Sequence, residues 1–334
     1  MELKYTTLFV MPDNDLFRVP DDYPARFAAS GIRLMRGSTE LGVAELAALA
    51  PGADALLMGS GRYPVSDPLL SLLPRCRLIV RMGAGYDNID VAAATRRGIV
   101  ASSMPGNLPE EVADHTIALF LTCLRRIGQQ DRALRAGRWD PMFAAPASRL
   151  AGQTVGFVGF GRIARAVARK MSGFGLHYLA YDPYAPADAG AGLGVQLVSL
   201  EDLLRRSDVV TLHLPATPET RNMFNAHAFN LMKPSAILVN TARGFLIDEQ
   251  ALLAALNEGR LRGAALDVFR DEPMRADSPL LSCDNVVMTP HTAGYSIEGL
   301  ADFFGFGHSL IADFLNRGTV PQWILNAEVV HTRV

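Results

Sequence analysis

The chain has 334 residues, enough for two domains that each bury a core of their own. Its 32 basic and 34 acidic residues give a net charge of −2, which argues against nucleic acid or an anionic membrane as a partner. Three widely separated cysteines indicate neither a disulfide framework nor a metal site. No apolar run approaches the about 18 residues of a membrane-spanning helix, so we expect a cytoplasmic protein.

The first hundred residues alternate between short apolar runs and helical patterns. This alternation predicts an α/β unit built on a parallel sheet. Two of its expected helices are Val43–Ala50 and Ile89–Arg97. The expected strands are Thr6–Met11, Ile32–Met35, Ala55–Met58, Leu78–Met82 and Gly98–Ala101.

A glycine-rich turn, formed by Gly83, Ala84 and Gly85, directly follows the fourth of these strands. Such a turn would present backbone N–H groups at the carboxyl end of a strand, where open α/β sheets bind ligands. The alternative is a plain turn without a ligand. The residues alone leave both interpretations open.

A long helix is expected to start at Pro109, because proline suits the first helical position and two glutamates follow in the first turn. Residues 112–124 are apolar on nearly every side, which predicts a buried crossover into a second domain. We interpret His115 within it as structural rather than catalytic. Residues 125–138 carry many charges and predict an exposed arm, which is either simply solvated or used for self-association.

The stretch Val155–Asp182 has the pattern of a dinucleotide site. A short apolar strand leads into G-x-G-x-x-A, formed by Gly159, Gly161 and Ala164. The first glycine permits a tight turn, the second lets the backbone approach a diphosphate, and the alanine lets helix and strand pack closely. We therefore predict that this turn binds a dinucleotide.

A helix is expected directly after this turn, and its free N–H groups near Arg162 would face the diphosphate. Asp182 follows a second apolar run, Tyr178–Tyr181, and its carboxylate can accept from the ribose hydroxyls of NAD. The same carboxylate would repel the 2′-phosphate of NADP, so NAD is the predicted cofactor. The alternative is that Asp182 only caps the loop. The apolar positions of the expected helix are Ile163, Val167, Met171 and Phe174.

The remaining residues predict a doubly wound parallel sheet. Ser199 fits a helix cap, and Glu249–Asn257 fits a helix between two later strands. Residues 185–194 are expected to form a loop. A last helical pattern from Leu300 has no strand after it, so we expect it to return to the first domain. The further strands are Asp208–Leu214, Ala236–Val239, Ala264–Val268 and Val286–Thr289.

Three polar residues follow predicted strands of this second domain: Arg243, Glu272 and His291. Taken singly, each could have an ordinary role in a loop or turn. Their shared placement at the ends of strands, at the sheet edge where a nicotinamide would lie, favours a functional role for the three residues together.

At this point the chain resembles the D-isomer-specific 2-hydroxyacid dehydrogenase family. The motifs that carry the resemblance are GFGRIA, YDPY, LHLPATPET, LVNTARG, LDVFRDEP and TPHTAG, in that order. RMGAGYDNID in the first half resembles the substrate loop of the same family, so the resemblance covers essentially the whole chain. The chain departs from the family pattern in two places. Ala164 replaces the commoner third glycine, and residues 100–111 have a sequence of their own, so no cofactor contact is assigned to them.

The resemblance implies an α/β fold of two domains, each a parallel sheet flanked by helices. A Rossmann-type NAD-binding domain, residues 104–296, would be inserted in a flavodoxin-like substrate domain made of residues 1–103 and 297–334. Homodimerisation through the cofactor domain is also implied. The implied reaction is hydride transfer between NAD(H) and a D-2-hydroxyacid/2-oxoacid pair, as in glyoxylate or hydroxypyruvate reductases and phosphoglycerate dehydrogenases.

The same resemblance implies a role for individual residues. Arg243 would bind the substrate carboxylate, His291 would be the acid/base, and Glu272 would be the partner of the histidine. Asp267 would meet the nicotinamide carboxamide. Further cofactor contacts would come from Gly159, Gly161, Arg162, Ile163, Asp182, Pro215, Thr220, Thr241, Ala242, His291 and Gly294, and substrate contacts from Gly83, Ala84, Gly85, Arg243 and His291.

Two other functions stay open. A formate dehydrogenase of this family would carry glutamine where Glu272 stands, which argues against that activity. An NAD-sensing corepressor or scaffold related to the family would share the motifs, so a rate of 2-oxoacid reduction is needed to tell the two apart. The sequence does not name the substrate. Arg62 and Arg81 could add affinity for a phosphate, although a surface or structural role is the simpler interpretation.

Overall fold

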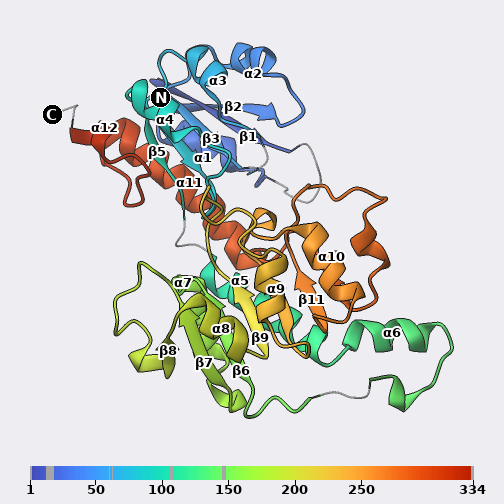
Figure 1. Cartoon of the computed structure of the whole chain (residues 1–334). Coiled ribbons are helices and arrows are strands. Elements are labelled where there is room, and N and C mark those ends of the chain that lie inside the picture. Colours follow the sequence, from blue (N-terminus) through green and yellow to red (C-terminus); the bar gives the residue numbers. More distant parts are fainter. Residues whose placement is uncertain are drawn as a thin grey trace. The chain divides into compact units, whose positions relative to one another are not determined.

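The computed structural model describes residues 2–12, 19–59, 61, 63–104, 108–144 and 148–331. The chain divides into two compact units, which we call unit 1 and unit 2. Unit 1 consists of Met1–Leu108 and Ser296–Val334, and unit 2 of Pro109–Tyr295. Unit 2 is thus inserted between the two segments of unit 1, which are blue to cyan and red in Figure 1. No helix in the described ranges is long and apolar enough to cross a membrane.

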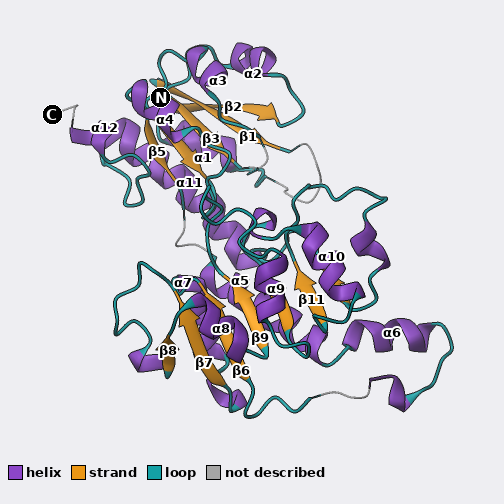
Figure 2. Ribbon diagram, viewed as in Figure 1, coloured by secondary structure: helices purple, strands orange, loops and turns teal. Residues whose placement is uncertain are grey.

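Unit 1 is built on a parallel sheet with the strand order β2-β1-β3-β4-β5. This is the order of flavodoxin-like folds, in which helices cover both faces of the sheet (Figure 2). Its first strand alternates between the faces: Leu8 and Val10 belong to one core, Phe9 and Met11 to the other. The strands are β1 Tyr5–Met11, β2 Ile32–Ser38, β3 Ala55–Met58, β4 Leu78–Arg81 and β5 Val100–Ser102.

The last long helix, α11, belongs to unit 1, as its sequence pattern predicted. Phe304 and Ile311 from α11 join Tyr23 and Phe27 from α1 in the core beneath one face of the sheet. Helices α2, α3 and α4 contribute to the core beneath the other face. The helices of unit 1 are α1 Tyr23–Ala29, α2 Val43–Leu49, α3 Asp67–Ser71, α4 Val91–Arg96, α11 Ile297–Arg317 and α12 Glu328–His331.

Unit 2 is a doubly wound parallel sheet with the strand order β12-β11-β10-β9-β6-β7-β8. Because the order reverses at β6 and β9, a crevice for a ligand is expected at the carboxyl ends of these two strands. The strands are β6 Thr154–Val158, β7 His177–Tyr181, β8 Val195–Leu197, β9 Val209–Leu212, β10 Ile237–Asn240, β11 Gly263–Leu266 and β12 Val286–Met288.

Helices cover both faces of this sheet as well. Residues of α5 and α7 share one core with the sheet, and residues of α8, α9 and α10 share the other. Helix α6 and the short 3-10 turn Pro141–Ala144 follow α5 and carry many exposed side chains, as expected for an arm. The helices are α5 Pro109–Leu124, α6 Ile127–Arg135, α7 Arg162–Lys170, α8 Leu200–Arg206, α9 Ala226–Leu231 and α10 Glu249–Asn257.

Two local expectations were wrong. The helix after the glycine turn ends at Lys170, and Phe174 lies in the separate 3-10 turn Ser172–Phe174 that leads to Gly175 in a left-handed conformation. The edge strand β8 was not expected, because its three residues are too few to show a period. The first difference lies at the end of a helix, where tertiary contacts outweigh local pattern.

Candidate functional site

The glycine turn between β6 and α7 is held by close backbone packing. Gly159 has φ +90°, and a Cβ placed on it would lie 2.7 Å from the carbonyl oxygen of His213. Gly159 therefore has to be glycine. A Cβ on Gly161 would meet nothing within 4 Å, so the space above this residue is open. Such open backbone is what a diphosphate needs in order to approach.

The start of α7 can bind an anion. The N–H groups of Gly161 and Ile163 have no acceptor among the described residues, and no side chain caps the helix. Arg162, the first residue of the helix, is exposed. Unpaired N–H groups and the positive end of the helix dipole favour a phosphate at this position. The turn therefore fits the diphosphate of a dinucleotide.

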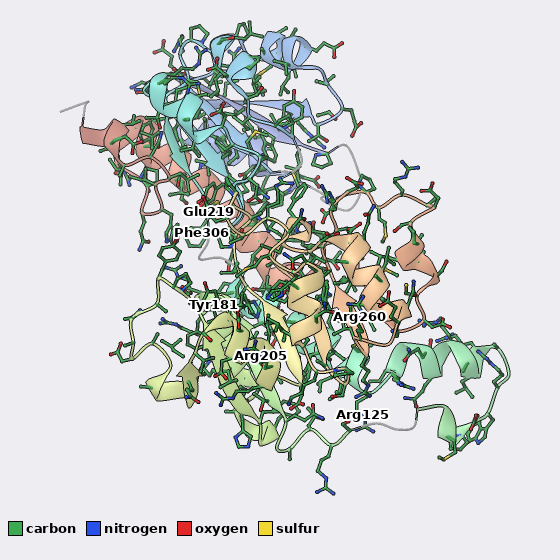
Figure 3. All side chains as sticks on the ribbon, in the orientation of Figure 1. Arg125, Tyr181, Arg205, Glu219, Arg260 and Phe306 are labelled. Atoms are coloured by element: carbon green, nitrogen blue, oxygen red, sulfur yellow. The ribbon has the colours of Figure 1, made fainter. Side chains whose placement is uncertain are left out.

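Asp182 lies directly after Tyr181, the last residue of β7, which is labelled in Figure 3. Its Oδ2 accepts from the backbone N–H of Phe160 at 2.9 Å, and its Oδ1 accepts from that of Tyr184 at 2.9 Å. The capping role that we considered for Asp182 is thus present. It leaves room for a ligand, because each carboxylate oxygen can accept a second hydrogen bond.

The loop after β9 brings Pro215 and Thr220 together. The Thr220 hydroxyl donates to the carbonyl oxygen of Pro215 at 2.8 Å, and the same hydroxyl accepts from the N–H of Thr217 at 2.8 Å. These bonds hold the loop at the carboxyl end of β9, which borders β6 in the sheet. Both residues therefore lie on the strand edge that also carries the glycine turn.

Arg243 stands in a turn that the buried side chain of Asn240 closes. The Asn240 amide donates to the carbonyl oxygen of Arg243 at 2.9 Å, and its oxygen accepts from the N–H of Ala242 at 3.0 Å. Thr241 within this turn is hydrogen-bonded to Thr116 of α5 at 2.8 Å. Gly244 follows, and a Cβ there would lie 2.0 Å from the backbone carbon of Phe269. The turn is consequently fixed at both of its ends.

Asp267 organises the loop that carries His291. The carboxylate is fully buried and accepts from the hydroxyl of Thr289 at 2.6 Å and from the N–H groups of Thr292 and Ala293 at 2.8 and 3.0 Å. Burial raises the pKa of Asp267, but hydrogen bonds from His115, Thr289 and the two N–H groups outweigh it and leave the pKa below its usual value. Gly294 continues the same loop.

His115 contacts this network from α5, as a structural histidine would. Its Nε2 lies 2.9 Å from the Thr289 hydroxyl and 3.5 Å from the Asp267 carboxylate. Because the Thr289 hydroxyl already donates to Asp267, it accepts from His115, so Nε2 carries a proton. The long-range contact fixes α5 to the loop after β12.

His291 and Glu272 form a hydrogen-bonded pair. His291 Nδ1 lies 2.7 Å from Glu272 Oε2, while Glu272 Oε1 accepts from the N–H of Phe269 at 3.0 Å. The Nε2 atom of His291 has no partner among the described residues, and the side chain is 44% exposed. His291 also has φ +58°, a conformation that is uncommon for a residue other than glycine and that its N–H bond to the Asp267 carbonyl helps to hold.

The remaining predicted residues belong to unit 1. Gly83, Ala84 and Gly85 follow β4, and the N–H groups of Ala84 and Gly85 have no acceptor in the described part of the chain. The Arg81 guanidinium donates to the carbonyl oxygen of Met82. A Cβ on Gly61 or Gly83 would lie within 3 Å of this guanidinium, so both glycines make room for it. Arg62 lies outside the described residues.

Some residues of the site were not singled out from the sequence. Asn240 was seen only as part of the motif around Arg243, and Thr289 only as a strand end. Asparagine after a buried strand often closes a turn, so that signal was present for Asn240. The contacts of Thr116 and His115 bridge more than a hundred residues and had no local signal.

The sequence of this chain is similar to proteins of known family. The NAD binding domain of the D-isomer specific 2-hydroxyacid dehydrogenases matches residues 117–293. A glyoxylate reductase from Korarchaeum cryptofilum is 42% identical over 275 residues, which cover 81% of this chain and 82% of that protein. A D-3-phosphoglycerate dehydrogenase from Mycobacterium leprae is 42% identical over 76% of this chain, which spans about half of that protein, 48%.

The chain belongs to the D-isomer specific 2-hydroxyacid dehydrogenase family. A crystal structure of D-lactate dehydrogenase from Aquifex aeolicus with NAD and lactic acid has a TM-score of 0.83 and 29% identity, covering 96% of this chain and 98% of that chain. The predicted family, fold class and NAD cofactor are therefore confirmed. So is the predicted class of enzyme, an oxidoreductase that transfers a hydride between NAD(H) and a D-2-hydroxyacid/2-oxoacid pair. The roles of individual residues stay predictions.

Proposed function

We propose that this dehydrogenase reduces small 2-oxoacids with NADH, with Arg243, His291 and Glu272 as its catalytic residues. The observation that carries the proposal is the 2.7 Å contact between His291 Nδ1 and Glu272 Oε2. It fixes the imidazole ring and leaves Nε2 available to a substrate. Glyoxylate is the first substrate to test, since 42% identity to a glyoxylate reductase supports it.

Each residue has a physical role in this proposal. Arg243 binds the substrate carboxylate through its planar guanidinium, which fixes the direction of the neighbouring carbonyl group. His291 donates the Nε2 proton to the carbonyl oxygen as negative charge develops there, and takes a hydroxyl proton in the opposite direction. Glu272 holds the imidazole ring through its contact with Nδ1. Bound NAD(H) supplies or accepts the hydride itself.

The cofactor contacts that we propose follow the edge of the unit 2 sheet. Gly159, Gly161, Arg162 and Ile163 would hold the diphosphate, and Asp182 the adenosine ribose. Loops after the neighbouring strands would contact the rest of the dinucleotide. These further contacts are Pro215, Thr220, Thr241, Ala242, Asp267, His291 and Gly294.

We also propose that Gly83, Ala84 and Gly85 bind the substrate carboxylate through backbone N–H groups. The unpaired N–H groups of Ala84 and Gly85 support this proposal. A carboxylate that accepts from two adjacent N–H groups would be held in one orientation.

A panel of 2-oxoacids tests the proposed function. The purified chain is assayed with NADH and glyoxylate, hydroxypyruvate, pyruvate, bulkier 2-oxoacids and 3-phosphohydroxypyruvate, and the acids are ranked by kcat/KM because this ratio reports discrimination in the transition state. Formate with NAD⁺ forms a separate arm. We expect turnover of at least one small 2-oxoacid. Binding of NADH without turnover of any acid would favour the corepressor-like alternative. Oxidation of formate would favour a formate dehydrogenase.

A homodimer and a cytoplasmic location complete the proposal. Trp139 and Met142, which follow α6, are 82% and 71% exposed, and Ile127 and Leu134 are also exposed. Apolar side chains of this size on one arm support a second copy of the chain as the partner. Light scattering after size-exclusion chromatography tests the dimer. A need for cellular NAD(H) and the presence of free thiols support the cytoplasm, which cell fractionation tests.

A further inference from the structure

A small cavity lies in unit 2 on the sheet edge opposite to the glycine turn. Its wall is formed where three strands begin: Ile237 starts β10, Arg262 immediately precedes β11 and Asn285 immediately precedes β12. It is also lined by Cys123 near the end of α5, Arg126 between α5 and α6, Gln129 of α6 and Val287 of β12. Arg243, Asp267 and His291 all follow the carboxyl ends of strands in this sheet, so the cavity is not part of the dinucleotide site.

Two guanidinium groups line this cavity without a carboxylate beside them. Neither Arg126 nor Arg262 has an ion pair among the described residues. Residues 145–147 of unit 2, which are not described, are Ala, Pro and Ala, so their side chains carry no carboxylate. Asp284 is the acid next to the wall in sequence, but its side chain is 99% exposed and reaches only Arg132, at 4.0 Å. Two adjacent cations without a counter-ion repel each other.

The structure nevertheless holds Arg262 in place. Its guanidinium donates to the carbonyl oxygen of Leu124 at 3.0 Å, and the Asn285 amide donates to the carbonyl oxygen of Arg262 at 3.2 Å. Burial and then the charge of Arg126 lower the pKa of Arg262. Gln129 is fixed in turn by a 2.6 Å hydrogen bond from its amide to the carbonyl oxygen of Asp284. The wall is therefore pre-organised, with a positive charge that no described residue neutralises.

We propose that this cavity binds a small anion between Arg126 and Arg262. Its empty space is about 280 Å³ with the open solvent at its mouth included, and the enclosed part holds no more than about one water-sized group. A phosphate or a carboxylate group would place one oxygen there and lie in the mouth, because guanidinium groups bind both through paired hydrogen bonds. The bound anion would connect the α5–α6 junction to the starts of β11 and β12. The effect is on the stability of unit 2 and not on the reaction.

The anion could come from solution or from a carboxylate of a second copy of the chain. Inorganic phosphate is the probe for the first source. Thermal unfolding is followed over a phosphate titration at constant ionic strength, set with sodium chloride, and with saturating NADH so that the glycine turn is filled. We expect a saturable rise of the melting temperature, roughly 5 to 10 °C at a hundred times the dissociation constant.

Three variants locate the effect. Arg126→Gln and Arg262→Gln should lose the phosphate-dependent rise, while Arg125→Gln should keep it. Arg125 is the matched control, because it is adjacent, exposed and outside the wall; it is labelled in Figure 3. Glutamine keeps much of the side-chain length, and NADH binding checks that each variant is folded.

The outcomes separate the two sources and can overturn the proposal. If the wild type does not respond to phosphate but Arg126→Gln or Arg262→Gln dissociates the dimer in light scattering while Arg125→Gln does not, a carboxylate of the second copy is the anion. If the wild type does not respond and the oligomeric state is the same in all variants, the cavity binds no anion. An equal phosphate response in all four proteins would also contradict the proposal, because the anion would then bind elsewhere.

Discussion

The side chain of Asn240 holds the backbone of Arg243. Its amide bonds the Arg243 carbonyl oxygen at 2.9 Å and the Ala242 N–H at 3.0 Å, and the side chain is fully buried. Asn240→Ala would leave both backbone groups unpaired and let the turn relax. We expect kcat/KM for the 2-oxoacid to fall by about 5- to 30-fold, from two hydrogen bonds of about 1 kcal/mol each.

The control for this prediction is Asn257→Ala, at an exposed position at the end of α10. The dissociation constant of NADH in Asn240→Ala should stay within about twofold of wild type, which a general loss of folding would not allow. A weaker affinity for NADH that accounts for the whole effect would show that Asn240 does not act through Arg243.

Substitution of Arg243 tests how the carboxylate is bound. Arg243→Ala should raise KM and lower kcat together, because the same contact binds the substrate and orients its carbonyl group. Arg243→Lys should restore little, since an ammonium group cannot form two parallel hydrogen bonds from one plane. Steady-state kinetics with the best 2-oxoacid measure both. Near wild-type kinetics in Arg243→Lys would mean that charge attraction alone is sufficient.

His291 and Glu272 should differ in how their loss affects turnover. His291→Gln removes the proton donor, so kcat should fall about 10²- to 10⁴-fold while NADH still binds. Glu272→Gln keeps a hydrogen-bond partner for Nδ1, so the ring stays oriented and partial activity is expected. Wild-type kcat in His291→Gln, or a loss of kcat in Glu272→Gln as large as that in His291→Gln, would contradict these roles.

Asp182 should determine the choice between NADH and NADPH. A carboxylate beside the ribose repels a 2′-phosphate, and residues 183–186 contain no basic residue that could compensate. We expect kcat/KM to favour NADH by at least about tenfold, and Asp182→Ser to narrow the gap. Because Asp182 also caps the N–H groups of Phe160 and Tyr184, the melting temperature of the variant is measured as a control. Equal use of both cofactors by the wild type would show that Asp182 does not contact the ribose.

His213 predicts a dependence of stability on pH. Burial lowers the pKa of His213 to about 3, and its ring packs against Phe157 with Nε2 3.0 Å from the Thr211 hydroxyl. The neutral form of His213 is therefore favoured in the folded state. Its contribution to the free energy of unfolding is complete above about pH 6.5 and is lost as the pH falls toward 3, because the unfolded chain binds a proton at His213 in this range and the folded chain does not. The loss is at most about 1.4 kcal/mol per pH unit.

Melting temperatures at pH 7 and pH 5 test this dependence. His213→Gln should lose less stability between these pH values than the wild type does. His177→Gln, which changes an exposed histidine of the same unit, should behave like the wild type. Equal acid sensitivity in all three proteins would mean that His213 is protonated as easily in the folded chain as in the unfolded chain.

The sequence by itself determined the class of fold and the chemistry of the turns. The spacing of Gly159, Gly161 and Asp182 predicts a dinucleotide site because each residue type meets a local requirement of backbone or charge. No strand comes after the helical pattern that starts at Leu300, and this was enough to assign that helix to the first domain. Local periodicity also predicted α10 with its observed bounds, since its cap and apolar face lie within one short segment.

Only the tertiary structure decided how the site is held. The bonds from Thr289, Thr292 and Ala293 to Asp267, and the bond between Thr116 and Thr241, join residues separated by 22 to 125 positions. The helix expected as far as Phe174 ended at Lys170, where Gly175 turns the chain toward β7. The sequence also did not predict that Arg126 and Arg262 line the same cavity, because side chains far apart in the chain come together only after the sheet has assembled.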